Sequence, residues 1–160
     1  MKAKPVRDSC SEMIEFVLPQ DANYFGNVLG GMVMHWVDLA GALAAQRHCR
    51  KHVVTASMDA LDFHSPIKMG HLAVFKSCVT FVSRTSMEVK VEVFSEDPLT
   101  GRRVQTSTAY LTYVALDKKG KPTPVPKLHP ETPDERREFE AGRKRREMRL
   151  KRLQQSPSKG

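Results

Sequence analysis

The stretch from Met32 to Ala45 constrains the fold more than any other part of the chain. Its residues are almost all apolar and have helix-forming composition, and His35 and Asp38 are the polar exceptions. A helix that lacks a polar face has to be covered by protein on most of its sides. We therefore expect a helix from about Met32 to His48 at the centre of the domain.

The segments on either side of this helix have the character of β-strands. Four runs rich in β-branched and aromatic residues follow it, at residues 53–63, 72–82, 86–96 and 104–116, and a short apolar run precedes it at residues 13–18. Turn-forming residues separate the runs at meander spacing, which favours antiparallel pairing. We predict an α+β fold in which five strands curl around one side of the helix. A second copy of the chain is expected to cover the rest.

The loop before the helix and the first two helical turns carry chemically useful groups. A polar loop containing Asn23 leads to Gly30 and Gly31, which would open the helix where unpaired backbone N–H groups face the loop. Asp38 lies about two turns further along, among apolar neighbours. A carboxylate in such surroundings is paired, protonated or catalytic. From the residues alone, a structural pairing with His35 and a catalytic role are both open.

Composition and cysteine spacing limit the classes of protein. At 160 residues there is room for one domain and a tail. No apolar run reaches the roughly 18–20 residues that span a bilayer, and the first ten residues lack the apolar middle of a signal peptide. Cys10, Cys49 and Cys78 are widely spaced and form no metal-binding motif. We expect reduced thiols, no disulfide, no metal site and a cytoplasmic location.

Charge is concentrated at the C-terminus. Of the net charge of +8, residues 134–160 contribute +5, from ten Lys/Arg and five Asp/Glu, which leaves +3 for the body. A mildly positive body suits an anionic small ligand. A basic tail can also bind nucleic acid, but acids dilute this one and no aromatic residue interrupts its RKRREMRLKR run. We favour a solvated helix that touches a neighbouring subunit, and expect neither nucleic acid nor membrane as a partner.

The boundary between body and tail is marked by proline. Residues 122–135 contain five prolines and are expected to form an extended arm that leaves the domain. Thr132 and Pro133 are then typical of the N-cap and first turn of a helix, which we expect to continue to about Leu153. We therefore divide the chain into a domain at 1–121, with its core at about 12–117, and an appendage at 122–160. The appendage comprises the arm, the charged helix and a disordered end.

The order of these features resembles the hotdog fold. It is most similar to the acyl-CoA thioesterases of the cytosolic (brain-type) acyl-CoA hydrolase family, over about residues 12–153. The concatenation of motifs is far more specific than any one of them. The matching residues are Asp21, Asn23, Gly26, Gly30, Gly31 and 38–41, then 54–59, Phe63, Pro66, Ile67, Gly70, 83–86 and 89–93. His71 departs from the family pattern, which commonly has an acid there.

The resemblance implies a fold, an activity and an assembly. It implies a five-stranded antiparallel sheet wrapped around a long central helix, dimerising through the sheet edge. It implies hydrolysis of fatty acyl-CoA to free fatty acid and coenzyme A, with no separate cofactor because coenzyme A is part of the substrate and product. The homodimer is expected to assemble into a hexamer, as a trimer of dimers.

The resemblance also assigns catalytic roles. Asp38 would be the general base that activates water, or the nucleophile. Asn23 of the partner chain would position the water or the thioester carbonyl, and backbone N–H groups at Gly30 and Gly31 would polarise that carbonyl. The chain itself fits chemistry without a covalent serine or cysteine, since it has no GxSxG motif and no cysteine with an evident histidine partner.

The turn at residues 83–86 is the implied binding site for the nucleotide end of coenzyme A. Arg84 would pair with phosphate, and the hydroxyls of Ser83, Thr85 and Ser86 would hydrogen-bond it. An ordinary hairpin turn is the alternative.

Several other polar or aromatic residues have simpler structural interpretations. We interpret His64 as a loop residue rather than a catalyst. Asp59 and Asp62 are interpreted as solvated strand residues rather than a metal pair, and Trp36 as a core residue.

Two other functions compete with hydrolysis. Hotdog hydratases and dehydratases carry a DxNPxH loop with a catalytic histidine, but here the loop reads DANYFG and has glycine in that place, so this class is rejected. A non-catalytic acyl-CoA-binding sensor is the remaining alternative. The presence of both Asn23 and Asp38 argues against it, because a binder does not need a base in an apolar helix.

Overall fold

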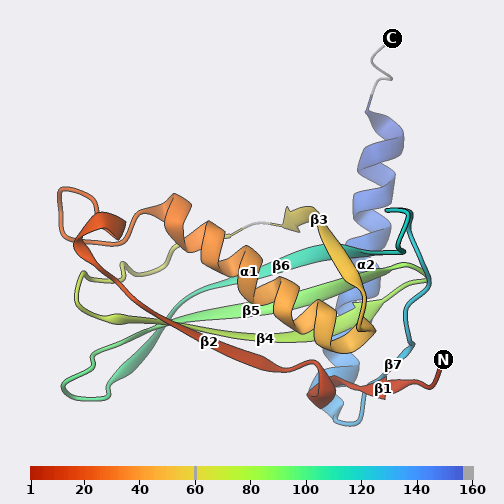
Figure 1. The fold of residues 1–160 in the computed structure, drawn as a ribbon, viewed down its shortest axis with the longest axis horizontal. Helices are drawn as coiled ribbons and strands as arrows, with labels where there is room; N and C mark the ends of the chain where they lie inside the picture. Colours follow the sequence, from red (N-terminus) through yellow and green to blue (C-terminus); the bar gives the residue numbers. More distant parts are fainter. Residues whose placement is uncertain (60, 157–160) are drawn as a thin grey trace.

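Two long helices lie on opposite faces of one curled sheet in the computed structural model, which describes residues 1–59 and 61–156 (Figure 1). The elements in chain order are β1 (Lys4–Pro5), η1 (Val6–Asp8), β2 (Ser11–Phe16), η2 (Pro19–Asp21), α1 (Gly30–Cys49), β3 (His52–Asp59), β4 (Leu72–Val82), β5 (Ser86–Glu96), β6 (Arg103–Leu116), β7 (Leu128–His129) and α2 (Pro133–Gln155). The expected disordered end falls on residues 157–160, outside the described residues.

The sheet confirms the predicted pattern. Its strand order is β2-β4-β5-β6-β3, and all four pairings are antiparallel. The predicted runs at residues 72–82, 86–96 and 104–116 agree with the observed strands to within one residue. β3 is shorter than predicted. It ends at Asp59, and residues 61–63 are not in a strand.

The concave face of the sheet packs against α1 to form the core. Val37 and Ala44 are fully buried, and Trp36 packs edge-on against Phe75 with ring centroids 6.0 Å apart. Trp36 is therefore a core residue, as predicted. On the same face, the Ser77 hydroxyl donates to the carbonyl of Ala40 at 2.9 Å and links the helix directly to β4.

The opposite side of α1 lacks a cover within one chain. Met34, Leu39 and Leu43 are 46%, 46% and 43% exposed, in a helix whose other face is fully buried. One curled sheet thus protects one side of an apolar helix, as the composition of α1 led us to expect. These exposed apolar side chains form a surface on which another molecule could pack.

The proline-rich arm does not leave the domain, which corrects the sequence-based expectation. Val125 and Leu128 are buried, and the backbone N–H of Val125 donates to the carbonyl of Arg84 at 3.0 Å. Leu128 lies in β7, which pairs in parallel with β1 near the N-terminus. The arm stays on the domain because its alternate apolar residues are buried and its backbone groups are bonded.

α2 is also more closely attached than a solvated helix would be. Its start is as predicted, with Thr132 and Glu135 forming a capping box. One face of α2 packs on the outer face of the sheet, where Glu88 is only 4% exposed. Arg145 donates to both carboxylate oxygens of Glu88 at 2.9 and 2.8 Å, and Thr80 donates to it at 2.7 Å. The buried charge is thus paired and hydrogen-bonded.

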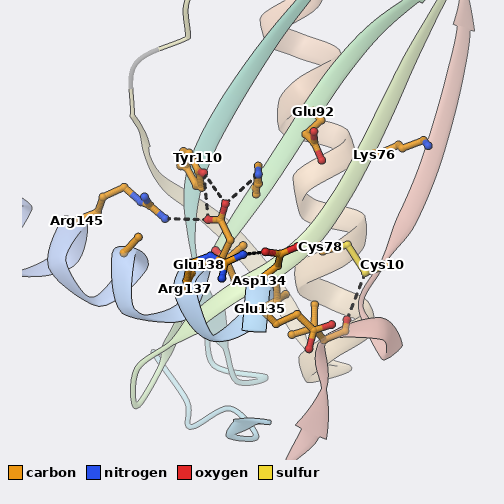
Figure 2. Close-up of a pocket in the computed structure, with 15 residues that line it drawn as sticks. Cys10, Lys76, Cys78, Glu92, Tyr110, Asp134, Glu135, Arg137, Glu138 and Arg145 are labelled. Atoms are coloured by element: carbon orange, nitrogen blue, oxygen red, sulfur yellow. Dashed lines mark hydrogen bonds and ion pairs between the residues drawn. A yellow bond between two sulfur atoms is a disulfide. The ribbon is translucent and has the colours of Figure 1, made fainter. Parts of the chain in front are cut away.

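A cavity of about 690 Å³ lies between α2 and the outer face of the sheet. Figure 2 shows that charged side chains of α2 meet those of the strands there. Glu138 accepts from Lys90 at 2.9 Å and from Tyr110 at 3.1 Å, and the Arg145 guanidinium stacks 3.8 Å from the centre of the Tyr110 ring. None of the residues predicted to be catalytic or to bind coenzyme A lines this cavity.

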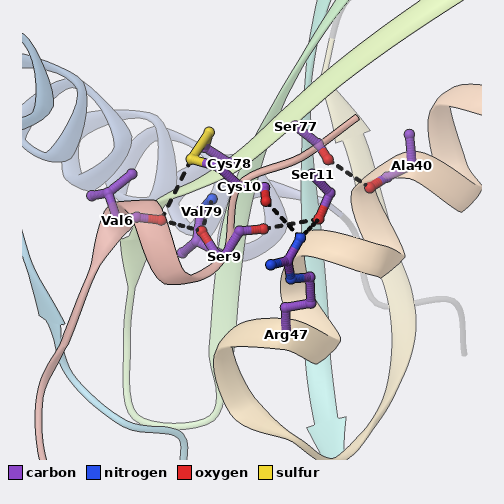
Figure 3. The surroundings of a disulfide bond; sticks show 9 residues. All are labelled: Val6, Ser9, Cys10, Ser11, Ala40, Arg47, Ser77, Cys78 and Val79. Atoms are coloured by element: carbon purple, nitrogen blue, oxygen red, sulfur yellow. Dashed lines mark hydrogen bonds between the residues drawn. A yellow bond between two sulfur atoms is a disulfide. The ribbon is translucent and has the colours of Figure 1, made fainter. Parts of the chain in front are cut away.

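A disulfide joins Cys10 to Cys78, so the expectation of three reduced thiols is wrong for this pair (Figure 3). The pairing of β2 with β4 sets Ser11 opposite Ser77, which brings the preceding Cys10 beside Cys78 although 68 positions separate them. Spacing along the chain cannot reveal such a contact. Cys49 is free and buried.

No helix within the described residues combines the length and apolarity needed to cross a membrane.

We predict that Gly142→Ala destabilises the protein. An added Cβ would lie 2.7 Å from the Cβ of Phe81 and 2.8 Å from a Glu88 carboxylate oxygen. Forcing α2 off the sheet should lower the free energy of unfolding by about 1–3 kcal/mol. Alanine's better helix propensity, worth about 1 kcal/mol, offsets only part of this cost. Chemical denaturation measures the change. Gln154→Ala, at an exposed position of α2, is the control and should remain within about 0.5 kcal/mol of wild type.

The disulfide gives a second stability prediction. Because it closes a loop between residues 68 positions apart, its loss should cost about 2–4 kcal/mol. Reductant should lower the melting temperature of the wild type but not that of Cys78→Ser. Alkylation of the denatured, unreduced protein followed by mass measurement should label Cys49 alone. Labelling of all three cysteines in oxidised protein would show that the bond does not form.

Candidate active site

A cavity of about 330 Å³ lies at the N-terminal end of α1. It brings together two of the predicted catalytic residues, Asn23 and Gly30. The remaining lining residues come from the loop before α1, from α1, from the loop after β3 and from the first half of β6; they are Asn27, Val28, Val33, Phe63, His64, Ser65, Pro66, Ile67 and Thr106.

Asn23 is held in one orientation by its own loop. Its side-chain oxygen Oδ1 accepts the backbone N–H groups of Phe25 at 3.0 Å and Asn27 at 3.2 Å. Because two donors converge on one end of the amide, that end is the oxygen and the other end is the NH₂ group. The described residues offer this Nδ2 no acceptor. Asn23 therefore presents two fixed N–H donors to whatever enters the site.

The start of α1 adds backbone donors beside Asn23. The helix begins at Gly30, and the amides of Met32 and Val33 both bond to the carbonyl of Leu29. Within the described ranges, no acceptor receives the N–H of Gly30 or of Gly31, as is usual for the first residues of a helix. These donors and the positive end of the helix dipole favour negative charge at this end of the cavity.

Asp38 is held by partners from the sheet, not by His35. Its carboxylate oxygen Oδ1 accepts from the hydroxyl of Thr55 at 2.6 Å and lies 3.2 Å from that of Tyr113. Oδ2 receives no hydrogen bond from any described residue. One carboxylate oxygen is thus held by the sheet, and the other has no donor among the described residues.

Thr55 and Tyr113 are the site residues that sequence reasoning missed. They are directly opposite each other in the pairing of β3 with β6, and a register shift follows immediately after Thr55. The segment containing Thr55 was part of the family resemblance, but no role was assigned to it. Their convergence on Asp38 depends on strand register, which can be inferred only once both strands and their pairing are known.

The donors and the base lie apart within one chain. Asp38 does not line the cavity that contains Asn23 and Gly30. The helix rise of about 1.5 Å per residue places Asp38 roughly 10 Å beyond Gly31. Within one chain, the donors therefore lie at the N-terminal end of α1, and the carboxylate of Asp38 lies about two turns further along the helix.

The turn predicted to bind coenzyme A forms the hairpin between β4 and β5. Ser83 and Ser86 satisfy each other, with their hydroxyl oxygens 2.6 Å apart and the Ser83 N–H bonded to the Ser86 carbonyl. The carbonyls of Arg84 and Thr85 hold Val125 and Ala115, and the Arg84 side chain is exposed. This turn lies near the C-terminal end of α1, opposite the end that carries Asn23 (Figure 1).

The remaining candidates are placed as follows. His64 lines the cavity at Asn23 and bonds through its backbone N–H to the carbonyl of Thr106 at 2.9 Å. Asp59 lies within 3.6 Å of Arg149 and 3.9 Å of Arg152 of α2, so it forms ion pairs. The described residues contain no cluster of three or more His, Cys, Asp or Glu side chains that could hold a metal ion.

Sequence comparisons identify relatives of this chain. Residues 25–102 match the family model described as the thioesterase superfamily. A Bacillus subtilis protein named as an uncharacterized acyl-CoA thioester hydrolase is 45% identical over 119 residues, which is 74% of this chain and 69% of the relative. The cytosolic acyl coenzyme A thioester hydrolase of Rattus norvegicus is 41% identical over 140 residues. That match covers 86% of this chain but only 36% of the longer rat protein.

Solved structures show the same fold over nearly the whole chain. An apo-hexameric acyl-CoA thioesterase is 41% identical with a TM-score of 0.91, covering 98% of this chain and 100% of that one. The acyl-CoA hydrolase of Staphylococcus aureus, solved with butyryl coenzyme A and coenzyme A, is 34% identical with a TM-score of 0.87 and coverage of 94% and 92%. Variants of that enzyme have also been solved in which an aspartate, a threonine or an asparagine is replaced by alanine.

The fold, the matching family model and the sequence identities all indicate the same family. This chain belongs to the thioesterase superfamily of hotdog proteins and, within it, to the acyl-CoA thioester hydrolases.

Proposed function

We propose that this protein hydrolyses acyl-CoA to a free acid and coenzyme A, with Asp38 as general base. The observation that carries the proposal is the asymmetric environment of the Asp38 carboxylate, whose Oδ1 is held while Oδ2 is left without a donor. The Staphylococcus aureus variants support it. Their asparagine, aspartate and threonine are separated by 15 and 17 positions. Asn23, Asp38 and Thr55 have the same separations, 38 − 23 = 15 and 55 − 38 = 17.

The geometry suggests a direct attack by water. Oδ2 of Asp38 takes a proton as the water oxygen bonds to the thioester carbon, and the carbonyl oxygen becomes an oxyanion. Nδ2 of Asn23 and the backbone N–H groups at Gly30 and Gly31 stabilise that charge. Collapse of the intermediate breaks the C–S bond, and the thiolate takes the proton from Asp38. Thr55 orients the carboxylate throughout.

We infer that each active site uses two chains. The donors at Asn23 and the base at Asp38 are separated along α1, so one chain does not easily place both on one thioester. The uncovered face of α1, with Met34, Leu39 and Leu43, gives a second copy an apolar surface on which to pack. An antiparallel partner helix there brings the partner's Asn23 loop toward Asp38.

We also propose a coenzyme A site and an assembly, and the same geometry supports both. The hairpin at residues 83–86 lies at the far end of α1 from its own Asn23, so a bound acyl-CoA that reaches both regions contacts more than one chain. Exposed Arg84 is the cation of that hairpin and would pair with phosphate. The hexameric state of a relative with a TM-score of 0.91 supports a hexamer built from dimers. Coenzyme A enters as part of the substrate, and we propose no other cofactor.

We propose a cytoplasmic location, which the name of the rat relative supports. In a reducing cytosol, Cys10 and Cys78 would be exposed to reduction of their disulfide.

Asp38→Asn tests the role of the base. The variant keeps the shape and the hydrogen bond from Thr55 but cannot take a proton, so kcat should fall by roughly 10²–10⁴. The measurement is release of free thiol from acyl-CoA, with the oligomeric mass determined in parallel. Asp62→Asn, an equivalent change at an exposed loop position, should leave kcat unchanged. Activity of Asp38→Asn within a few-fold of wild type would exclude the general-base role. Binding of acyl-CoA by the wild type without thiol release would favour the non-catalytic sensor.

Mixing two inactive variants tests the shared site. If Asn23 and Asp38 of different chains meet, an Asn23→Ala subunit paired with an Asp38→Asn subunit has one intact site and one doubly damaged site. Activity should recover toward half of the wild-type value per heterodimer, after subunit exchange confirmed by native mass spectrometry. Each variant exchanged with itself is the control and should stay inactive. Complete exchange without recovery would mean that each chain supplies both residues of its own site.

A further inference from the structure

The Tyr113 side chain connects the sheet to the helical turn that carries Asp38. It is fully buried, and its hydroxyl donates to the backbone carbonyl of Asp38 at 2.7 Å while lying 3.2 Å from the carboxylate Oδ1. Burial, and then the neighbouring Asp38 carboxylate, raise the pKa of Tyr113. The hydroxyl is therefore protonated at physiological pH and acts as a donor toward Asp38.

The Tyr113 hydroxyl thus contacts Asp38 at two points, the main-chain carbonyl and the carboxylate Oδ1. Both contacts come from one buried side chain of β6. That side chain holds the helical turn that carries Asp38 in a defined position relative to the sheet.

Gly41 makes this approach possible. A Cβ at position 41 would lie 2.3 Å from the Tyr113 hydroxyl oxygen and 2.9 Å from the ring carbon that bears it. Neither distance is compatible with a side chain while Tyr113 stays in place. Glycine weakens a helix interior relative to alanine, so its presence here has a structural reason. That reason is the close contact with Tyr113.

We propose that Tyr113 is a positioning residue for thioester hydrolysis, which acts through Asp38 and does not itself touch the substrate. The inference rests on the proposed general-base role of Asp38. Tyr113 and Thr55 face each other across β6 and β3 and approach the same carboxylate oxygen. Thr55 orients the carboxylate group, and Tyr113 anchors the main chain beneath it. Both contact Oδ1, and no described residue donates to Oδ2.

Tyr113→Phe removes the hydroxyl and keeps the buried ring. Without the hydroxyl, the Asp38 carbonyl and Oδ1 lose their contact with β6, and Thr55 alone holds the carboxylate. Because small displacements of a catalytic group are costly, kcat should fall about 10- to 100-fold. KM should stay within about two-fold. The matched control is Tyr110→Phe on the same strand, whose hydroxyl bonds to Glu138 of α2 and which should retain wild-type kcat.

The division between kcat and KM separates positioning from a general loss of structure. A displaced carboxylate should lower kcat while KM and the melting temperature stay close to the wild-type values, whereas a general loss of structure should change all three. A folded Tyr113→Phe protein with the wild-type kcat would overturn the inference.

A double-mutant cycle keeps this outcome distinct from failure of the proposed function. If Tyr113 acts through Asp38, adding Tyr113→Phe to Asp38→Asn should cause no further loss of kcat. An equal loss in both backgrounds would overturn the positioning role even if Asp38 is the base. Substantial activity in Asp38→Asn alone would instead contradict the proposed function. Gly41→Ala is the second variant: it keeps the tyrosine but displaces it, and should lower kcat at unchanged KM. Wild-type kcat in folded Gly41→Ala would also overturn the inference.

Discussion

The absence of a polar face on α1 is the constraint on which the rest of the structure depends. Such a helix is stable only inside protein, and the curled sheet supplies one half of its surroundings. Residues such as Val37 and Ala44 are therefore fully buried, whereas Met34 and Leu39 on the opposite side remain partly exposed. Two sets of polar groups on α1 bear on the proposed chemistry. Its N-terminal amides face a cavity, and Asp38 faces two hydroxyls of the sheet.

Most of the fold could be predicted because the spacing of apolar residues and the local composition depend directly on secondary structure. The alternation of Met87, Val89, Val91 and Val93 with charged residues marks β5, and the Thr132–Glu135 capping box marks the start of α2. The packing of α2 could not be predicted in this way. It depends on Gly142, which has no side chain to keep α2 away from the sheet. It also depends on charged residues such as Glu88 and Arg145, whose residue types suggest exposure to solvent but which form an ion pair in the fold.

The candidate site divides in the same manner. Asn23, Gly30 and Asp38 could be named from the sequence because their residue types and spacing occur within one continuous segment. Thr55 and Tyr113 could not, because they meet Asp38 only through the register of two strands. The Cys10–Cys78 bond has the same origin, since it too depends on which residues face each other across a sheet. Contacts made by register are absent from any local pattern.

The close contact of Gly41 with Tyr113 has an evolutionary consequence. A side chain larger than hydrogen at position 41 cannot coexist with a tyrosine ring at position 113, and a smaller residue at 113 leaves a void beneath the helix. The two positions therefore constrain each other, and a substitution at either one alone is expected to cost packing. A chain with both positions changed together would need another way to hold its carboxylate.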